Sequence, residues 1–300
     1  MAANMKLGIN LGFATNKYPE PHVWTRIVGE ELGLKYVQFV ADMLQAFLPD
    51  NIIKKEVERI NVNKQKYGIE ITSTFLSSQT RVNHLFHPDH AQRQEWLEWF
   101  KRFADYSADL GAKSTGGHLG ILTFDVFDNQ ARREQVVSEG IKNWQELSWY
   151  CKERGMKYMI FEPMSVPREF AYSVAATREI MDRLNENAGI PFKLCLDIGH
   201  APHPDERDPY VWIRELGAIS PIIHIQQTEL NHSRHWPFTE EYNKAGIIKG
   251  EEIVAAFEEH GMDDIEFIFE LYHREHWDTD SRIIEDHKKS VNYWRQFITN

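Results

Sequence analysis

A repeated local pattern constrains the fold of this chain more than any other feature of its sequence. Seven times, a stretch with helical periodicity ends at a glycine, and a short β-rich run follows. The glycines are Gly33, Gly68, Gly111, Gly155, Gly189, Gly217 and Gly261. Glycine is favoured just beyond a helix end because it adopts the left-handed conformation without the steric cost of a Cβ atom. The pattern therefore predicts helices that end at these positions and strands that begin after them.

With one further run at the start, the sequence contains eight candidate strands. They cover residues 6–13, 34–40, 69–75, 112–118, 156–162, 190–197, 222–226 and 264–270. The segments between them are typical of amphipathic helices; Trp96, Phe100 and Phe103, for example, share one helical face. Eight alternating units in 300 residues, without a linker, favour an α/β fold: a single-domain (β/α)8 TIM barrel over residues 1–300. An open doubly wound sheet is the alternative, but no G-x-G-x-x-G motif follows the first run.

Charge and composition exclude several classes of partner. The net charge of −11 argues against binding to nucleic acid or to an anionic membrane surface, since both require a cationic face. No apolar stretch approaches the roughly 18 residues that a membrane span needs. The two cysteines, Cys151 and Cys195, lie in unrelated contexts, which argues against a disulfide framework. We therefore expect a cytoplasmic enzyme that acts on a small molecule.

Four consecutive predicted strands carry chemically active side chains at or near their carboxyl ends. These side chains are Glu162, Asp197, His224 and Glu270. In a barrel, residues at these strand ends face the active site. A single such residue is more often a helix cap, a loop ion pair or a core histidine. Three carboxylates at one mouth would repel each other strongly, so the set predicts a divalent metal ion; its oxygen-rich character favours Mn²⁺, Mg²⁺ or Co²⁺, with Zn²⁺ possible.

The same segments resemble the xylose isomerase-like barrel superfamily of sugar isomerases and epimerases. The likeness covers essentially the whole chain and is most specific at Phe161-Glu162-Pro163, at Leu196–His200, in the strand of His224 and at Phe269-Glu270-Leu271. It implies one divalent metal, most often manganese, held by Glu162, Asp197, His224 and Glu270, and a substrate contact from His200. The opening Leu7–Asn10 and the stretch from Trp24 to Phe39 look like a subgroup that acts on small phosphorylated ketoses of the erythrulose 1-phosphate type.

The expected reaction is inversion of C3 of a ketose or ketose phosphate. One carboxylate removes the C3 proton, a cis-enediolate forms, and a second carboxyl group returns a proton to the opposite face. The fifth and eighth strands flank the set of four, so Glu162 and Glu270 are the predicted acid–base pair. Asp197 and His224 would mainly hold the metal.

Predictions of further substrate contacts rest on single residues. Arg168 and Arg234 are candidates to bind phosphate, since a guanidinium matches phosphate oxygens. Gly117 with its neighbour Gly116 could present backbone N–H groups to an anion, or could be required for tight packing. His118 and Trp236 could also line the pocket. Members of the resembled group commonly carry an arginine a few residues after the metal-binding histidine, whereas here the first is Arg234.

Other functions remain open from the sequence. The same ligand set suits an aldose–ketose isomerase, and lower-ranked alternatives are a polyol-ketone dehydratase, an apurinic endonuclease-like hydrolase and a non-catalytic sugar-binding protein. The histidine-rich segment 232–236 is interpreted as a substrate-facing loop or lid in preference to a second metal site. A dimer or tetramer is expected by analogy, with no interface identified.

Overall fold

The computed structural model describes residues 3–77, 80–200, 204–273, 275 and 280–299. Its strands are β1 (Asn4–Asn10), β2 (Tyr36–Val40), β3 (Glu70–Phe75), β4 (Ser114–Gly117), β5 (Tyr158–Phe161), β6 (Phe192–Asp197), β7 (Ile222–Ile225) and β8 (Asp264–Phe269). They follow one another in chain order in a closed barrel. The predicted (β/α)8 TIM barrel is therefore confirmed.

Helices connect the strands, as expected. They are α1 (Pro21–Arg26), α2 (Asp50–Tyr67), α3 (His90–Asp109), α4 (Phe124–Asp128), α5 (Gln130–Glu153), α6 (Val174–Asn185), α7 (Pro209–Leu216), α8 (Glu240–Ala245), α9 (Gly250–His260) and α11 (Ile283–Trp294). Asp208 caps α7 by accepting a hydrogen bond from the N–H of Tyr210, and Asp89 caps α3 through the N–H of Gln92. None of the described helices combines the length and the apolar character that crossing a bilayer requires.

By its internal contacts the chain divides into two compact units. The first comprises residues 1–39, 59–71 and 194–300, and the second comprises residues 40–58 and 72–193. The expectation of a single domain over the whole chain stays a prediction.

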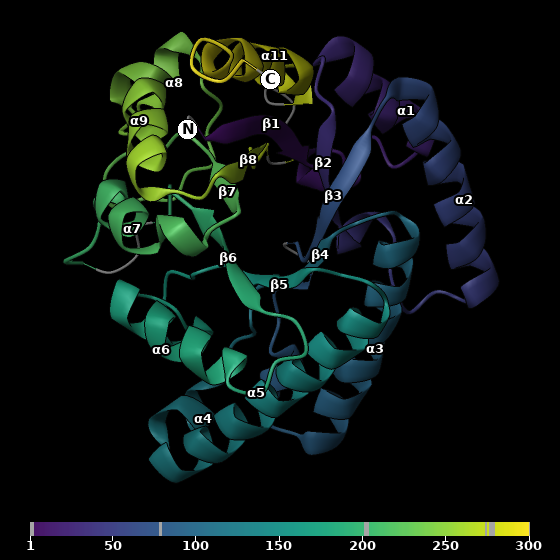
Figure 1. The fold of residues 1–300 in the computed structure, drawn as a ribbon, viewed down its shortest axis with the longest axis vertical. Coiled ribbons are helices and arrows are strands. Elements are labelled where there is room, and N and C mark those ends of the chain that lie inside the picture. Colours follow the sequence, from purple (N-terminus) through teal and green to yellow (C-terminus); the bar gives the residue numbers. More distant parts are fainter. Residues whose placement is uncertain (1–2, 78–79, 201–203, 274, 276–279, 300) are drawn as a thin grey trace. The chain divides into compact units, whose positions relative to one another are not determined.

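The first unit contains β1, most of β2 and β6 to β8. In its parallel register Asp197 pairs with His224, and His224 pairs with Ile268. Helices α7 and α9 contact each other and lie on the outer side of β6–β8 (Figure 1). This cover buries the apolar outer faces of the strands and leaves the strand ends to carry polar side chains.

The second unit contains most of β3, and β4 and β5. Phe75 on β3 pairs with Gly116 on β4, and Gly117 pairs with Phe161 on β5. Helices α3 and α5 pack against each other (Figure 1), with Phe100 and Trp144 in ring contact between them. The register puts Gly117 level with Phe161, the residue before Glu162.

The glycine pattern is confirmed at four of its seven positions. Gly33, Gly68, Gly111 and Gly155 have positive φ angles, as the left-handed helix end requires. Gly217 and Gly261 have φ angles of −55° and −87°, and Gly189 is not among the glycines with a positive φ, so the prediction of a left-handed conformation is wrong at these three positions. A Cβ atom at Gly217 would lie 2.8 Å from the carbonyl oxygen of His260, so close packing explains this glycine.

Candidate functional site

Three of the predicted metal ligands come together in the first unit through strand register. Asp197 and His224 are paired on β6 and β7, and paired residues of neighbouring strands point to the same face of a sheet. Glu270 follows Ile268, the partner of His224, by two residues, and its N–H continues the ladder to the carbonyl of Ile225 at 3.1 Å. Because side chains alternate with a period of two, Glu270 shares that face.

These three side chains form a compact, mostly buried group. Their ligand atoms lie within 4.8 Å of one another. Asp197 is 4% exposed and His224 is fully buried, whereas the side chain of Glu270 is 25% exposed. The group therefore combines two carboxylates and an imidazole in a place where Glu270 remains open to solvent.

A chain of hydrogen bonds fixes which nitrogen of His224 carries the proton. The N–H of Gly12 donates to Oδ1 of Asn10, so the amide NH2 of Asn10 is the group that donates to Oε1 of Gln38, at 2.7 Å. Oε1 of Gln38 is therefore an acceptor, and it lies 2.7 Å from Nε2 of His224. His224 must donate from Nε2, and in the neutral ring that a metal ligand requires this leaves the lone pair on Nδ1.

The lone pair on Nδ1 points toward a negative charge. Nδ1 of His224 lies 3.2 Å from Oε2 of Glu270. When the ring is neutral, the Nδ1 lone pair and the carboxylate repel each other unless a cation lies between them, whereas a protonated ring forms an ion pair with Glu270. The donor set of carboxylate oxygens and one imidazole suits a divalent ion, and the hydrogen bond on the far ring nitrogen is the outer support that metal-binding histidines ordinarily have.

Asp197 is held at both carboxylate oxygens. Its Oδ1 accepts the N–H of Gly199 at 2.6 Å, and its Oδ2 accepts the amide of Gln226 at 2.8 Å. Nε2 of His200 lies 3.4 Å from the same Oδ2. His200, which was predicted to contact substrate, thus stands beside a ligand and is close to the group.

In the second unit, the two predicted residues Glu162 and His118 lie together at the ends of β5 and β4. Glu162 is 3% exposed and its N–H continues the ladder to the carbonyl of Gly117 at 3.2 Å. Nδ1 of the buried His118 lies 3.6 Å from Oε2 of Glu162. Among the described residues, neither ring nitrogen of His118 has a hydrogen-bond partner. A buried, unpartnered imidazole beside a carboxylate is suited to hydrogen-bond a substrate hydroxyl.

The two arginines predicted to bind phosphate already have partners in the protein. Arg168 donates to the carbonyl of Leu122, and its guanidinium lies 4.1 Å from the centre of the Phe124 ring. Arg234 donates from Nε to Glu229 at 2.9 Å. Both arginines are thus occupied by local contacts, and their role in substrate binding stays a prediction.

Gly117 and Trp236 also have structural roles. A Cβ atom at Gly117 would lie 2.6 Å from Cβ of Leu76, and its φ of 151° disfavours other residues, so packing accounts for this glycine. Trp236 exchanges two backbone hydrogen bonds of 2.9 Å with Gln227, and its ring stacks on Tyr242. These contacts fold the segment around residues 232–236 back onto the end of β7, and its role as a substrate-facing loop stays a prediction.

An ion pair that the sequence did not predict, between Arg81 and Glu169, joins two of the long loops. Arg81, in the loop after β3, donates from Nε to Glu169 at 2.6 Å and from Nη2 to its second oxygen. Glu169 is 1% exposed, and its hydrogen bond raises the pKa of the Arg81 guanidinium. Phe170, which follows Glu169, has a φ of 67°, a strained conformation of the kind found at functional sites. Only the length of the two loops signalled this contact in the sequence.

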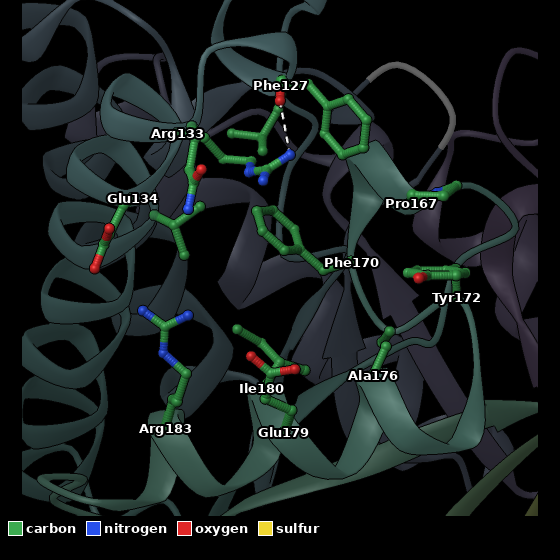
Figure 2. Close-up of a pocket in the computed structure, with 14 residues that line it drawn as sticks. Phe127, Arg133, Glu134, Pro167, Phe170, Tyr172, Ala176, Glu179, Ile180 and Arg183 are labelled. Carbon is green, nitrogen blue, oxygen red and sulfur yellow. Dashed lines mark hydrogen bonds between the residues drawn. The ribbon is translucent and has the colours of Figure 1, made fainter.

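A cavity of about 600 Å³ lies elsewhere in the second unit, between α4, α5 and α6. Figure 2 shows Phe170 projecting into it, with Arg133 and Arg183 on its walls and Glu134 and Glu179 nearby. Arg133 donates to the carbonyl of Phe127 at 2.8 Å. Neither of the two ligand-type groups found among the described residues lies in this cavity, so it is not a competing metal site.

The sequence of this chain is similar to those of a known family and of a known enzyme. The model of the family described as "Xylose isomerase-like TIM barrel" matches residues 28–296 of this chain. The chain belongs to this family. D-erythrulose 1-phosphate 3-epimerase of Brucella abortus is 33% identical over 299 residues, covering 98% of this chain and 96% of that protein. The predicted family and the predicted enzyme class, an isomerase, are thus confirmed.

Solved structures agree on the fold. A Rhodospirillum rubrum protein provisionally named a xylose isomerase superposes with a TM-score of 0.89 at 29% identity, covering 97% of this chain and 99% of that chain. D-psicose 3-epimerase from Clostridium cellulolyticum, solved with D-tagatose, superposes with a TM-score of 0.74 at 14% identity, covering 98% and 99%. The second likeness bears on the fold alone.

Proposed function

We propose that this chain is a metal-dependent epimerase that inverts C3 of a small ketose or ketose phosphate. The observation that carries the proposal is the His224 lone pair, directed at Glu270 beside Asp197 in a group that suits a divalent ion. The Brucella relative, which has a 3-epimerase activity on a phosphorylated ketose, supports the reaction and the substrate class. We propose Mn²⁺ as the ion, with Mg²⁺, Co²⁺ and Zn²⁺ as alternatives.

The fourth proposed ligand is Glu162. Its carboxylate is buried at the end of β5, and the likeness to the xylose isomerase-like family at Phe161-Glu162-Pro163 supports this assignment. The ion supplies positive charge that stabilises negative charge on the substrate oxygens when a neighbouring C–H bond ionises.

Glu162 and Glu270 are the proposed acid–base pair. One carboxylate takes the proton from C3, and the other, in its protonated form, delivers a proton to the opposite face of the same carbon. No proton is gained or lost overall, because each group returns to its first state by exchange with solvent. In this proposal His118 and His200 hydrogen-bond substrate oxygens and so hold C3 between the two carboxyl groups.

Arg81 is the proposed contact for a substrate phosphate. Its pair with Glu169 uses Nε and Nη2 and so orients the guanidinium. No hydrogen bond is found for Nη1 in the part of the chain that the structure describes. The charge of Glu162 also raises the pKa of Arg81, which supports a position near the reacting groups. Arg168, Arg234, Gly117 and Trp236 remain candidates for further contacts.

The proposal is tested by isotope exchange. The protein is stripped of metal, reloaded with Mn²⁺ and incubated in D2O with four- to six-carbon ketoses, with and without phosphate. Deuterium at C3 together with the C3 epimer is the expected result. An aldose product with deuterium at C1 or C2 would show an aldose–ketose isomerase, and no exchange in any ketose would contradict the proposal.

The phosphate contact is tested with the same substrates. Arg81→Lys keeps a positive charge beside Glu169 but removes the Nη1 donor, so KM for a phosphorylated ketose should rise about 10-fold, the worth of a charged hydrogen bond. KM for the unphosphorylated ketose should not change. Arg168→Lys is the matched comparison, and a phosphate-specific rise in KM there, without one in Arg81→Lys, would transfer the role to Arg168.

A cytoplasmic location also belongs to this proposal. It is supported by Cys151 and Cys195, buried thiols that form no disulfide among the described residues. Assembly into a dimer or tetramer stays a prediction.

A further inference from the structure

A second group of ligand-type side chains adjoins the first. Atoms of Asp197, His200 and His235 lie within 4.8 Å of one another, so Asp197 belongs to both groups. A carboxylate with two imidazoles is a set that binds Zn²⁺ or Mn²⁺ in many proteins. By residue type alone, the protein would hold two ions bridged by Asp197.

The amide of Gln226 stands inside this second group. Its Nε2 lies 2.8 Å from Oδ2 of Asp197, 3.1 Å from Oγ of Ser233 and 3.3 Å from Nε2 of His235. An amide nitrogen carries two hydrogens and no lone pair for a metal. Those hydrogens occupy the acceptor positions that a cation would otherwise use.

The orientation of this amide is fixed by its other end. Oε1 of Gln226 accepts the backbone N–H of His235, so the NH2 group must face Asp197. Nδ1 of His235 lies 3.0 Å from the carbonyl oxygen of Glu270, to which it must donate, since a carbonyl only accepts. Nε2 of a neutral His235 is then an acceptor, as a contact with the Gln226 amide requires. His235 also has a φ of 51°, so its backbone is strained to keep this arrangement.

We propose that Gln226 limits this protein to one metal ion, because its amide fills the place between Asp197, His200 and His235 that a second ion would take. The inference rests on the proposed function, since it presumes an ion on the neighbouring group. Gln226 acts here as a positioning residue: it keeps Oδ2 of Asp197 turned toward an N–H donor instead of a second cation.

Replacing the Gln226 amide by a carboxylate puts a negatively charged oxygen beside Asp197 in place of an N–H donor. In Gln226→Glu, one oxygen can still accept the N–H of His235, while the other faces Asp197 at hydrogen-bond distance. Two carboxylate oxygens at that distance repel each other, and a divalent ion with His200 and His235 as further ligands relieves the repulsion. The variant should therefore bind two ions per chain, whereas the wild-type chain binds one.

The experiment counts ions without measuring activity. Metal-free wild-type and Gln226→Glu proteins are dialysed against Mn²⁺ at several concentrations, and bound manganese is measured by mass spectrometry against protein concentration. Electron paramagnetic resonance distinguishes two isolated ions from an exchange-coupled pair bridged by Asp197. One ion in the wild type, and two coupled ions in the variant, are expected. Gln226→Ala, which removes the amide without adding charge, should bind a second ion at higher Mn²⁺ concentration.

Gln227→Glu is the matched control, because Gln227 is also fully buried and directly adjacent. Its Nε2 donates to Asn243 and to the carbonyl of Ile248, both at 2.9 Å, away from the ligand group. This control should bind one ion.

Three outcomes would count against the inference. Two ions on the wild-type chain would overturn it, and so would a single ion on both Gln226 variants when circular dichroism shows them folded. No ion on the wild-type chain would instead overturn the metal dependence of the proposed function, and this inference with it.

Discussion

Two buried glutamines, Gln38 and Gln226, stand beside the two ligand groups and present opposite ends of their amides. Gln38 turns its carbonyl oxygen to Nε2 of His224, the nitrogen opposite the one that faces Glu270. Gln226 turns its NH2 group into the group of Asp197, His200 and His235. Both side chains are fully buried and fully hydrogen-bonded, so burial does not distinguish them.

In our proposal, residue type and proximity do not by themselves make a metal site. Each group contains histidine and Asp197, and in each the ligand-type atoms lie within 4.8 Å of one another. What differs is whether a neighbouring donor already occupies the lone pairs that would face the ion. We propose that the orientation of one amide, set by a backbone N–H group or by a second side chain, decides this in each group.

Glu270→Gln is expected to have the largest effect, because it places an amide in the first group, as Gln226 does in the second. The variant loses a ligand charge and a proposed proton carrier together, so kcat should fall about 10³-fold or more while the fold is retained. Initial rates with the best ketose, and thermal unfolding, measure the two effects. Glu266→Gln, on the strand β8 that ends just before Glu270, is the control and should keep near wild-type activity. A Glu270→Gln enzyme with substantial turnover would remove Glu270 from the proposed mechanism.

Gln38→Leu tests the other glutamine and should have a smaller effect. Without Oε1 of Gln38, His224 has no partner for Nε2 and either ring nitrogen can carry the proton. Loss of such an outer partner typically weakens metal binding 10- to 100-fold. We expect this increase in the Kd for Mn²⁺, with most of kcat recovered at saturating Mn²⁺.

The measurement for Gln38→Leu is equilibrium dialysis against Mn²⁺, followed by kinetics across the same concentrations. Asn10→Ala, which removes only the residue that orients Gln38, should show the same change with a smaller amplitude. An unchanged Kd in Gln38→Leu would mean that His224 keeps its tautomer without this support.

The barrel could be predicted from the sequence because each strand and helix of the repeat carries its own local signals. The run 156–162 contains β5 (Tyr158–Phe161), and Asp208-Pro209 marks the start of α7, both set by neighbours in sequence. The predicted metal ligands were proposed on equally local signals: Glu162 and Glu270 directly follow β5 and β8, and Asp197 and His224 lie in β6 and β7. Local signals also failed, as at Gly217, where a distant carbonyl and not the helix end explains the glycine.

The supporting residues were not predictable because their roles depend on register between distant segments. Gln38 and His224 are separated by 186 positions, and Arg81 and Glu169 by 88. Nothing in the sequence near Gln226 shows which end of its amide faces Asp197. A buried amide has no preferred direction until the strands on both sides are in place.

His84 is a further buried imidazole, and it lies outside both groups of ligand-type side chains. Its ring is fully buried against Phe100 and Trp144, and Nδ1 accepts the N–H of Leu85 at 2.9 Å. Desolvation lowers its pKa from 6.5 to about 3. The folded state therefore keeps His84 neutral while the unfolded chain gains a proton below pH about 6.5.

The stabilisation that neutral His84 gives is complete above pH about 6.5 and is lost as the pH falls toward about 3. In this window His84 should lower the free energy of unfolding by about 1.4 kcal/mol per pH unit. His84→Asn keeps a side-chain acceptor for Leu85, tolerates the positive φ of this residue and does not titrate. Urea unfolding between pH 7.5 and 4.5 should show a pH slope smaller by that amount in the variant. Equal slopes would mean that another group, such as the buried His287, whose pKa is lowered to about 4, dominates the acid sensitivity.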